Sequence, residues 1–438
     1  MSETKNTISP EIIESFLSGS HEQKYIVAIE SEYSTPTVHL VINDPEKGKY
    51  VEPDTYKPFL WCKHDVTTMI YEGKRTKIIE MCGKYGIKFK ALRTADDNGH
   101  SPERMLNGYK YLVTCKKSYN DLINFFKEGG VDVFKPEYSK SFVMFSPTEQ
   151  YLIQTGKRLF KGIDDYDGLH RFQFDLETEG LFASKHAIFQ FGVRDNRNIE
   201  YVLEVLGDTP AERRNAERDA IQKFFQIIDI IQPDLITGYN SENFDWAFIF
   251  ERAERLGMDV TDLAITLNRF SKIKRKPSTL KLGGETENYL QTHMWGYNIV
   301  DISHAVRRAM AINSEIKSWG LKYITQYSGI AKPNRVYVPG DKINSTWRDT
   351  ENDYAFNNEN GDWYKISEKY PLKDGYKIVK GNYIVQRYLQ DDLWETEQVD
   401  NLYNQASFLI AKMLPTTFMR SSTMGTAGQW KLIMAACS

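Results

Sequence analysis

The stretch Arg171-Phe-Gln-Phe-Asp-Leu-Glu-Thr-Glu-Gly180 decides the fold. Successive side chains of a β-strand point to opposite faces, so one face of this segment is apolar while the other carries Asp175 and Glu177. Gly180 interrupts the alternation and ends the strand. Two neighbouring carboxylates repel each other unless a divalent cation with a preference for oxygen neutralises them. An edge strand with a solvated acidic face is the alternative interpretation.

Strand and helix signals continue on the carboxyl side of this segment. Residues 187–193 and 199–205 are apolar and β-prone, and their spacing predicts antiparallel strands that begin a mixed sheet. Residues 212–231 have helical spacing, and residues 235–239 form a short apolar strand. The first 150 residues alternate short strands with two amphipathic helices. The sequence therefore predicts an α/β fold, preceded by a smaller α+β amino-terminal domain.

Another acid, Asp245, ends the segment Gly238-Tyr-Asn-Ser-Glu-Asn-Phe-Asp245, which leads into a helix over residues 246–256. Aspartate is a favoured N-cap, and roughly 0.5–2 kcal/mol of capping would explain it without any chemistry. However, Asn240 ends the preceding strand and Phe244 is an aromatic residue at a turn. Because open α/β sheets hold ligands at such strand-to-helix corners, we favour a site role for Asp245.

A long helix is predicted over residues 383–408. Tyr388 and Asp392 lie four residues apart, so they occupy one face of this helix at the edge of its apolar stripe. A polar stripe contains Arg387, Asp391 and Glu395. We interpret Asp391, one turn after Arg387, as part of a solvated row of ion pairs, which favours Asp392 as the site residue.

Composition limits the function classes. The chain has 438 residues and a net charge of −3, so bulk charge does not indicate a nucleic-acid binder. Its local cluster of cations is Lys272, Lys274, Arg275 and Lys276, for which a solvated loop is the usual explanation.

The four cysteines are widely spaced and are interpreted as reduced thiols. Neither a secretion signal nor an apolar run long enough to cross a membrane is visible. We expect a soluble, cytoplasmic protein.

Four carboxylates, those of Asp175, Glu177, Asp245 and Asp392, would be expected to converge with Tyr388. Such a group of acids is stable if roughly two divalent ions about 3.5–4 Å apart lie among them. Two Mg²⁺ ions fit oxygen ligands best. Chemistry of this kind cleaves a phosphodiester.

The three motifs, in the order Phe-Asp-Leu-Glu-Thr, Tyr-Asn-Ser-Glu-Asn-Phe-Asp and Tyr-Leu-Gln-Asp-Asp, resemble the exonuclease motifs of family B DNA polymerases. These are of the proofreading DEDDy type and have a ribonuclease H-like fold, here a mixed sheet flanked by helices. The stretches Val300-Asp-Ile-Ser-His-Ala-Val-Arg-Arg308 and Ser318-Trp-Gly-Leu-Lys-Tyr-Ile-Thr325 resemble the family's intervening segments, and Gln150-Tyr-Leu-Ile-Gln-Thr-Gly156 resembles its lead-in. The likeness covers about residues 105–438.

The resemblance implies a role for each matching residue. Asp175 would bridge two Mg²⁺ ions, with Mn²⁺ as a substitute, Glu177 and Asp392 would complete the first metal site, and Asp245 would hold the second through water. Tyr388 would steady the attacking water or the scissile phosphate. Thr178, Asn240 and Phe244 would grip the single-stranded 3′ end of DNA, and the basic cluster Lys272, Lys274, Arg275 and Lys276 would contact duplex.

The resemblance also implies a domain plan. We expect an amino-terminal domain over 1–150 and an exonuclease domain over 151–410, with a β-hairpin at about 272–298 and an insertion of short strands or irregular structure at about 332–380. Palm, fingers and thumb motifs are absent, and residues 411–438 resemble the start of the palm side. The chain is therefore expected to be the amino-terminal half of a phage-type replicative polymerase, with a carboxy-terminal polymerase half as a separate chain or missing region.

Two other functions remain open at this stage. A free-standing DEDDy exonuclease could act on RNA or repair intermediates, and a non-catalytic scaffold of the same fold could bind nucleic acid without cutting it. The dangling carboxyl end favours the polymerase-associated exonuclease over the first alternative. The complete set of four acids and a tyrosine argues against the second.

Overall fold

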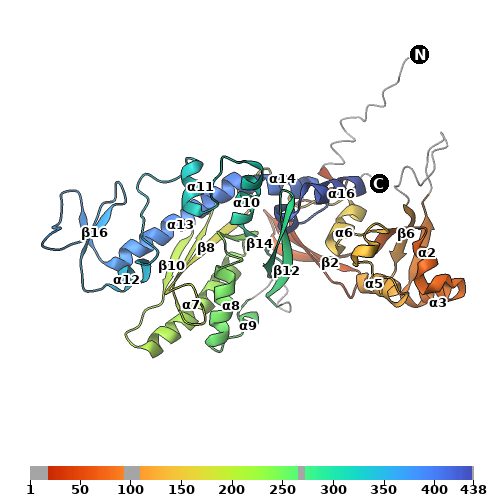
Figure 1. The fold of residues 1–438 in the computed structure, drawn as a ribbon, viewed down its shortest axis with the longest axis horizontal. Helices are drawn as coiled ribbons and strands as arrows, with labels where there is room; N and C mark the ends of the chain where they lie inside the picture. Colours follow the sequence, from red (N-terminus) through yellow and green to blue (C-terminus); the bar gives the residue numbers. More distant parts are fainter. Residues whose placement is uncertain (1–17, 93–108, 265–271, 437–438) are drawn as a thin grey trace, which may run out of the picture. The chain divides into compact units, whose positions relative to one another are not determined.

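The computed structural model describes residues 18–92, 109–264 and 272–436, which form two compact units (Figure 1). The first unit contains the described residues up to Lys161, together with Ala411–Thr417 and the chain from Lys431. The second contains Gly162–Ile410 and Phe418–Trp430. The boundary therefore follows Lys161 rather than residue 150, and the segment after 410 is shared between both units. A hydrogen bond helps to hold residues 411–417 in the first unit, because Nε of the buried Arg158 donates to the carbonyl of Met413 at 3.1 Å.

The first unit combines two antiparallel sheets with short helices. Its apolar core includes Leu60, Val113 and Phe125, all fully buried. Cys62, Cys82 and Cys115 are free thiols, and Cys437 lies outside the described residues. One sheet has the order β1 (Ile26–Ser31), β2 (Thr37–Asp44), β3 (Gly48–Thr55); the other has the order β5 (Ile87–Ala91), β6 (Tyr109–Cys115), β4 (Phe59–Lys63), β7 (Phe142–Val143); the helices are α2 (Val66–Met69), α3 (Arg75–Tyr85), α5 (Tyr119–Glu128) and α6 (Pro147–Thr155).

A five-stranded mixed sheet forms the centre of the second unit, as the sequence predicts. Its order is β10 (Glu200–Glu204), β9 (Ile188–Asp195), β8 (Arg171–Thr178), β11 (Leu235–Gly238), β14 (Asn298–Asp301). The first three strands are antiparallel, and β11 runs parallel to both β8 and β14. Since β8 is the middle strand, the alternative of an edge strand with a solvated acidic face is wrong.

The two faces of β8 pack against different helices. Figure 1 shows α7 (Pro210–Ile231) and α8 (Asp245–Arg255) on one face of the sheet and α13 (Gly381–Tyr403) on the other. The apolar face of β8 meets the first pair, because the ring of Phe174 lies 5.1 Å from Phe224 and 4.9 Å from Trp246. The acidic face of β8 consequently turns toward α13.

Gly192 brings α13 close to the sheet. It pairs with Asp175 across β8 and β9. A Cβ atom at residue 192 would lie 2.8 Å from Cγ of Leu389 and 2.8 Å from Cδ1 of Leu393, which is too close for packed atoms. The missing side chain therefore lets α13 approach the strand pair beside Asp175.

The segments between the sheet and α13 follow the predicted order with some shifted boundaries. Strands β12 (Lys274–Leu282) and β13 (Glu285–His293) form an antiparallel hairpin at the predicted position. The long late helix, predicted over 383–408, ends at 403, and a second helix follows from 405. The other elements of this unit are α9 (Val260–Leu263), α10 (Ile302–Ile312), α11 (Leu321–Tyr327), α12 (Ile343–Arg348), a sheet of order β16 (Trp363–Lys365), β15 (Tyr354–Phe356), β17 (Lys377–Val379), and α15 (Phe418–Thr423); α14 (Gln405–Met413) and α16 (Thr426–Ala436) each contribute to both units.

Within the described part of the chain, no helix is both long and apolar enough to pass through a lipid bilayer.

Candidate nuclease site

Three of the predicted acids meet in the second unit. Asp175 and Glu177 come from β8 and Asp392 comes from α13. One carboxylate oxygen of each lies within 4.8 Å of the others. Glu177 and Asp392 are buried, whereas Asp175 is half-buried and keeps some access to solvent. Residues more than 200 positions apart in the sequence therefore form one group of oxygen donors.

Asp245 is the fourth acid, and the structure changes its interpretation. It occupies the first position of α8, and Phe244 takes the cap position without a side-chain hydrogen bond. The capping explanation is therefore wrong. Asp245 is buried, and its Oδ1 has no hydrogen-bond partner among the described residues. Burial and the charge of Asp175 raise the pKa of Asp245 well above its usual value, which ties it electrostatically to the cluster.

Burial and mutual repulsion dominate the electrostatics of the cluster. Burial and the charge of Asp392 raise the pKa of Asp175 to about 8. Burial and the charges of Asp175 and Asp392 raise the pKa of Glu177 well above its ordinary range. Crowded carboxylates of this kind are stabilised by protons or by a cation. Oxygen donors that repel one another, together with the unpartnered Oδ1 of Asp245, fit divalent ions such as Mg²⁺.

Tyr388 lies one turn before Asp392 on α13, as the spacing predicts. Its hydroxyl accepts a hydrogen bond from Nζ of Lys322 in α11, and this nitrogen lies 3.9 Å from Oδ2 of Asp392. Burial and the charge of Asp392 raise the pKa of Tyr388, so the phenol stays protonated. Tyr388 is thus a hydrogen-bonding group held at the edge of the acidic cluster.

Sequence reasoning missed Arg335, which is buried beside Asp392. Its guanidinium forms an ion pair with Asp392, and its Nε lies 3.1 Å from Oε2 of Glu395. The guanidinium carbon also lies 4.9 Å from the ring centroid of Tyr388. Glu395 is fully buried, and burial raises its pKa to about 7. The only available signal was a cationic residue in the 332–380 insertion, and no spacing rule connects that segment to α13.

The predicted solvated row on α13 is also wrong, because Asp391 is fully buried. Its Oδ1 lies 3.0 Å from Nζ of Lys332, and its Oδ2 accepts a hydrogen bond from the backbone of Val336 at 3.0 Å. Its partners therefore come from the insertion rather than from Arg387. The insertion supplies counter-charges to the face of α13 that carries Asp392.

The loop before Asp245 is fixed by Asp301, at the end of β14. The Asp301 carboxylate accepts hydrogen bonds from the backbone N–H groups of Asn240 at 2.9 Å and Glu242 at 3.1 Å. Asn240 has a φ of +60°, a left-handed conformation that asparagine tolerates. Phe244 is half-buried, and its ring centroid lies 5.4 Å from that of Phe248. This network sets the position from which α8 and Asp245 begin.

The remaining predicted contact residues lie around the site with mixed exposure. Thr178 ends β8, and its hydroxyl donates to the carbonyl of Gly180 at 3.0 Å. The basic cluster begins at the hairpin, where Lys272, Lys274 and Lys276 are exposed. Arg275 differs from them, because it is half-buried and donates to the carbonyls of Glu242 and Leu290.

Comparison with known proteins agrees with this architecture. Residues 184–324 match the family model for the exonuclease domain of DNA polymerase family B. This segment contains Asp245 and the hairpin, whereas Asp175, Glu177 and Asp392 lie outside it.

Individual relatives are similar over part of their length. A DNA polymerase of Pyrococcus glycovorans is 28% identical over 184 residues, covering 41% of this chain and 21% of the relative. A DNA polymerase of Pyrococcus horikoshii is 25% identical over 251 residues, covering 56% of this chain and 17% of the relative. The chain thus matches about a fifth of the length of these curated relatives.

A solved structure shares the fold. The family B DNA polymerase of Pyrobaculum calidifontis superposes with a TM-score of 0.61 at 15% identity, covering 93% of this chain and 49% of that structure. Residues 184–324 are therefore similar to the exonuclease domain of DNA polymerase family B, and the chain shares the fold of about half of a solved polymerase of that family.

Proposed function

We propose that this chain is a magnesium-dependent 3′→5′ exonuclease that removes nucleotides from single-stranded DNA ends, as the proofreading part of a phage-type family B DNA polymerase. The observation that supports it most is the meeting of Asp175, Glu177 and Asp392 within 4.8 Å. An acidic cluster alone is common, but this one lies beside a buried acid with an unpartnered oxygen, Asp245. A replication enzyme of this kind would work in the cytoplasm, that of the host if a phage encodes it.

The chain's own residues would divide the work. Asp175, Glu177 and Asp392 would offer oxygens to the ions directly, and Asp245 would complete the donor set from the start of α8. Bound divalent ions supply a deprotonated water and neutralise the departing 3′ oxygen in reactions of this class. Tyr388, protonated at neutral pH, would donate a hydrogen bond to the water or the phosphate.

The single-stranded end would be held by residues on both sides of the acids. Phe244 would offer its ring face to a base, an interaction worth roughly 1–3 kcal/mol. Asn240 and Thr178 would contact the sugar-phosphate chain. The exposed Lys272, Lys274 and Lys276 would contribute non-specific attraction to duplex phosphates, whereas Arg275 would act mainly in holding the hairpin base.

The decisive test is a trimming assay on a 5′-labelled DNA strand with Mg²⁺. We expect a ladder of progressively shorter products with the wild type, and none with Asp175→Ala plus Glu177→Ala. The matched control is Glu254→Ala, an exposed acid on α8, which should trim like the wild type. Equal trimming by the double variant would remove the proposal.

The same assay separates the rival functions. Preferential trimming of an RNA strand of the same sequence would favour a free-standing exonuclease acting on RNA. Tight binding without trimming by the wild type would favour a non-catalytic scaffold. The proposed association with a carboxy-terminal polymerase half is tested separately, by asking whether such a polypeptide co-purifies with the chain and adds template-directed synthesis.

A further inference from the structure

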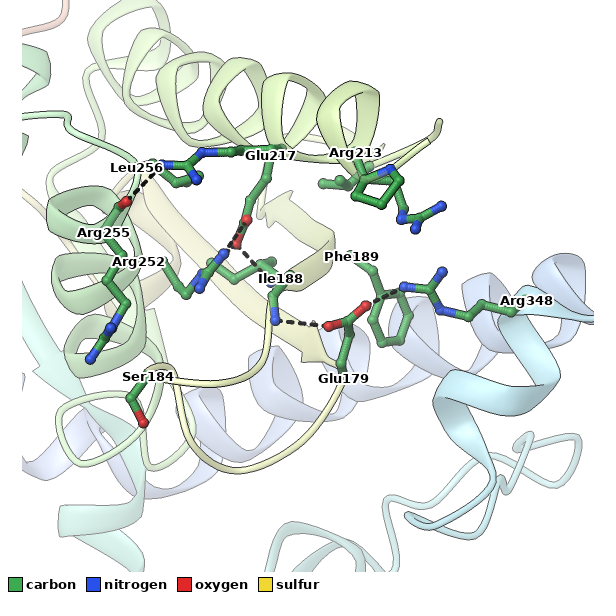
Figure 2. Close-up of a pocket in the computed structure, with 14 residues that line it drawn as sticks. Glu179, Ser184, Ile188, Phe189, Arg213, Glu217, Arg252, Arg255, Leu256 and Arg348 are labelled. Atoms are coloured by element: carbon green, nitrogen blue, oxygen red, sulfur yellow. Dashed lines mark hydrogen bonds and ion pairs between the residues drawn. The ribbon is translucent and has the colours of Figure 1, made fainter. Parts of the chain in front are cut away.

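A second charged site lies between the two helices on the apolar face of the sheet and the insertion. A pocket of about 460 Å³ lies at this place, and Figure 2 shows the residues that line it. It is distinct from the acidic cluster, since none of the four clustered carboxylates lines it. Its charged and hydroxyl-bearing lining residues are Glu179 and Ser184 from the loop between β8 and β9, Arg213, Arg214 and Glu217 from α7, Arg252 and Arg255 from α8, and Arg348 from α12.

Positive charge exceeds negative charge in this lining, with five arginines against two glutamates. One ion pair is buried: the Glu217 carboxylate accepts hydrogen bonds from Nε of Arg252 at 2.7 Å and from Nη2 of Arg252 at 2.6 Å. Glu217 also accepts the backbone N–H of Ile188 at 2.9 Å. This buried pair therefore ties α7, α8 and β9 together and adds no net charge to the pocket.

The other glutamate, Glu179, forms an ion pair with Arg348, as Figure 2 shows. The side chains of this pair are partly exposed, at 26% and 35%. Arg255 pairs with Glu251, which does not line the pocket. Solvent-accessible ion pairs of this kind exchange partners at little cost, so these arginines can accept another anion.

Two further arginines have backbone carbonyls as their partners within the described residues. Arg213 donates to the carbonyls of Gly207 and Asp208 at 3.1 and 3.0 Å, and Arg214 donates to the carbonyl of Arg255 at 3.1 Å. No described carboxylate lies within 4.0 Å of either guanidinium. A carbonyl orients a guanidinium but does not neutralise it. Capping of the end of α8 accounts for Arg214, whereas the carbonyl partners of Arg213 leave the charge of its guanidinium available to a ligand.

We propose that this arginine-lined pocket binds the phosphate groups of a nucleotide or of a single-stranded nucleic acid. The planar guanidinium matches phosphate oxygens with paired hydrogen bonds. The volume lies in the range of pockets that enclose small ligands. The loop that forms one wall begins at Glu179, directly after Glu177 and Thr178, so a ligand here would adjoin the end of β8. The choice of nucleic-acid phosphates rests on the proposed function, whereas the presence of an anion site does not.

The test uses the full chain carrying Asp175→Ala plus Glu177→Ala, in EDTA, so that neither cleavage nor metal-bound phosphate interferes. One arm titrates thymidine monophosphate and follows thermal stabilisation. The other measures binding of a labelled thymidine oligomer of about 12 nucleotides at several salt concentrations. Each arm compares the parent with Arg213→Ala, Arg348→Ala and Arg213→Lys. The matched control is Lys223→Ala, an exposed cation of α7 outside the pocket.

We expect Arg213→Ala and Arg348→Ala each to weaken binding about tenfold or more, because each removes a charge-assisted hydrogen bond. Arg213→Lys should lose less, and Lys223→Ala should match the parent. Loss in the monophosphate arm identifies a nucleotide, and loss in the oligomer arm with a shallower salt slope identifies a strand. Unchanged binding in both arms would overturn the proposal. If the pocket binds phosphate as expected but the wild type does not trim DNA, the proposed function alone is wrong.

Discussion

The two halves of the acidic site differ in where their counter-charges come from. On α13, Asp391, Asp392 and Glu395 lie against Lys332 and Arg335. On β8 and α8, no described Lys, Arg or His nitrogen lies within 4.0 Å of Asp175, Glu177 or Asp245. The α13 half therefore receives its cationic partners from the protein itself, and the other half is left for a ligand of positive charge. The difference implies that substitutions in the two halves should fail in different ways.

The largest expected effect is the loss of trimming in Asp175→Asn, with no loss of stability. The amide removes a metal ligand but also relieves repulsion with Glu177 and Asp392. We therefore expect no detectable products, and a metal-free unfolding midpoint at or above that of the wild type. Added Mg²⁺ should stabilise the wild type and leave the variant unchanged. A destabilised variant would mean that Asp175 already has a cationic partner.

Arg335→Ala should fail in the opposite way, through stability. It leaves Asp392 and Glu395 buried without their cation, which costs roughly 3–5 kcal/mol. Chemical denaturation measures the loss. Arg387→Ala on the same helix is the control and should change stability little, since Asp391 takes its partners from the insertion. Equal losses of stability in both variants would mean that Arg387 is an ion-pair partner on α13, as the sequence predicted.

The pH dependence of metal-free stability should sharpen the contrast. The folded pKa of Asp175, about 8, exceeds its unfolded value of about 3.9, so the folded state holds more protons between them. Stability from this group is present at acid pH and falls as pH rises toward 8. Denaturation in EDTA at several pH values measures the slope. Asp175→Asn should make the slope shallower, because it removes one titrating group and relieves Glu177 and Asp245, and a slope of the opposite sign would contradict the shift.

Gly192→Ala should disturb the contact between the two halves. The added methyl group would lie 2.8 Å from Leu389 and Leu393, forcing α13 away from β9 and Asp392 away from Asp175. Overpacking of this size costs about 1–3 kcal/mol. Trimming should fall further than stability, because the donor set loses its spacing. The control is Gly284→Ala, because a Cβ at Gly284 would have open space around it. Gly257→Ala is unsuitable, since Gly257 has a φ of +71°.

Tyr388→Phe should give the smallest effect. The ring and its packing on Arg335 remain, and only the hydroxyl that accepts from Lys322 is lost. We expect trimming to slow by up to about tenfold, corresponding to about 1.4 kcal/mol. Single-turnover rates at saturating Mg²⁺ measure it. Wild-type rates would demote Tyr388 to a packing residue.

Much of this arrangement follows from local patterns in the sequence. The alternation around Asp175 predicted a strand with one acidic face, and the mixed sheet, the hairpin and the shared face of Tyr388 and Asp392 followed from period and turn residues. These features depend on neighbours within about one turn of helix or one strand pair.

The main errors concern contacts between distant segments. The burial of Asp391 could not be read from α13, because its partner Lys332 lies some 59 residues earlier in a stretch without periodicity. The burial of Arg335 likewise could not be predicted from its neighbours in the sequence. The capping explanation of Asp245 failed because the cap position falls one residue earlier, on Phe244, a shift below the resolution of sequence patterns.

The small sheet of the insertion has a consequence for any attempt to shorten the chain. Tyr354 and Phe356 of β15 share one apolar cluster with Val336, Ile384 and Tyr388. Deleting residues 350–380 would therefore remove part of the apolar cluster around Tyr388 and expose its side chain. The shortest chain that keeps Tyr388 packed therefore includes β15, which lies outside the three acidic motifs.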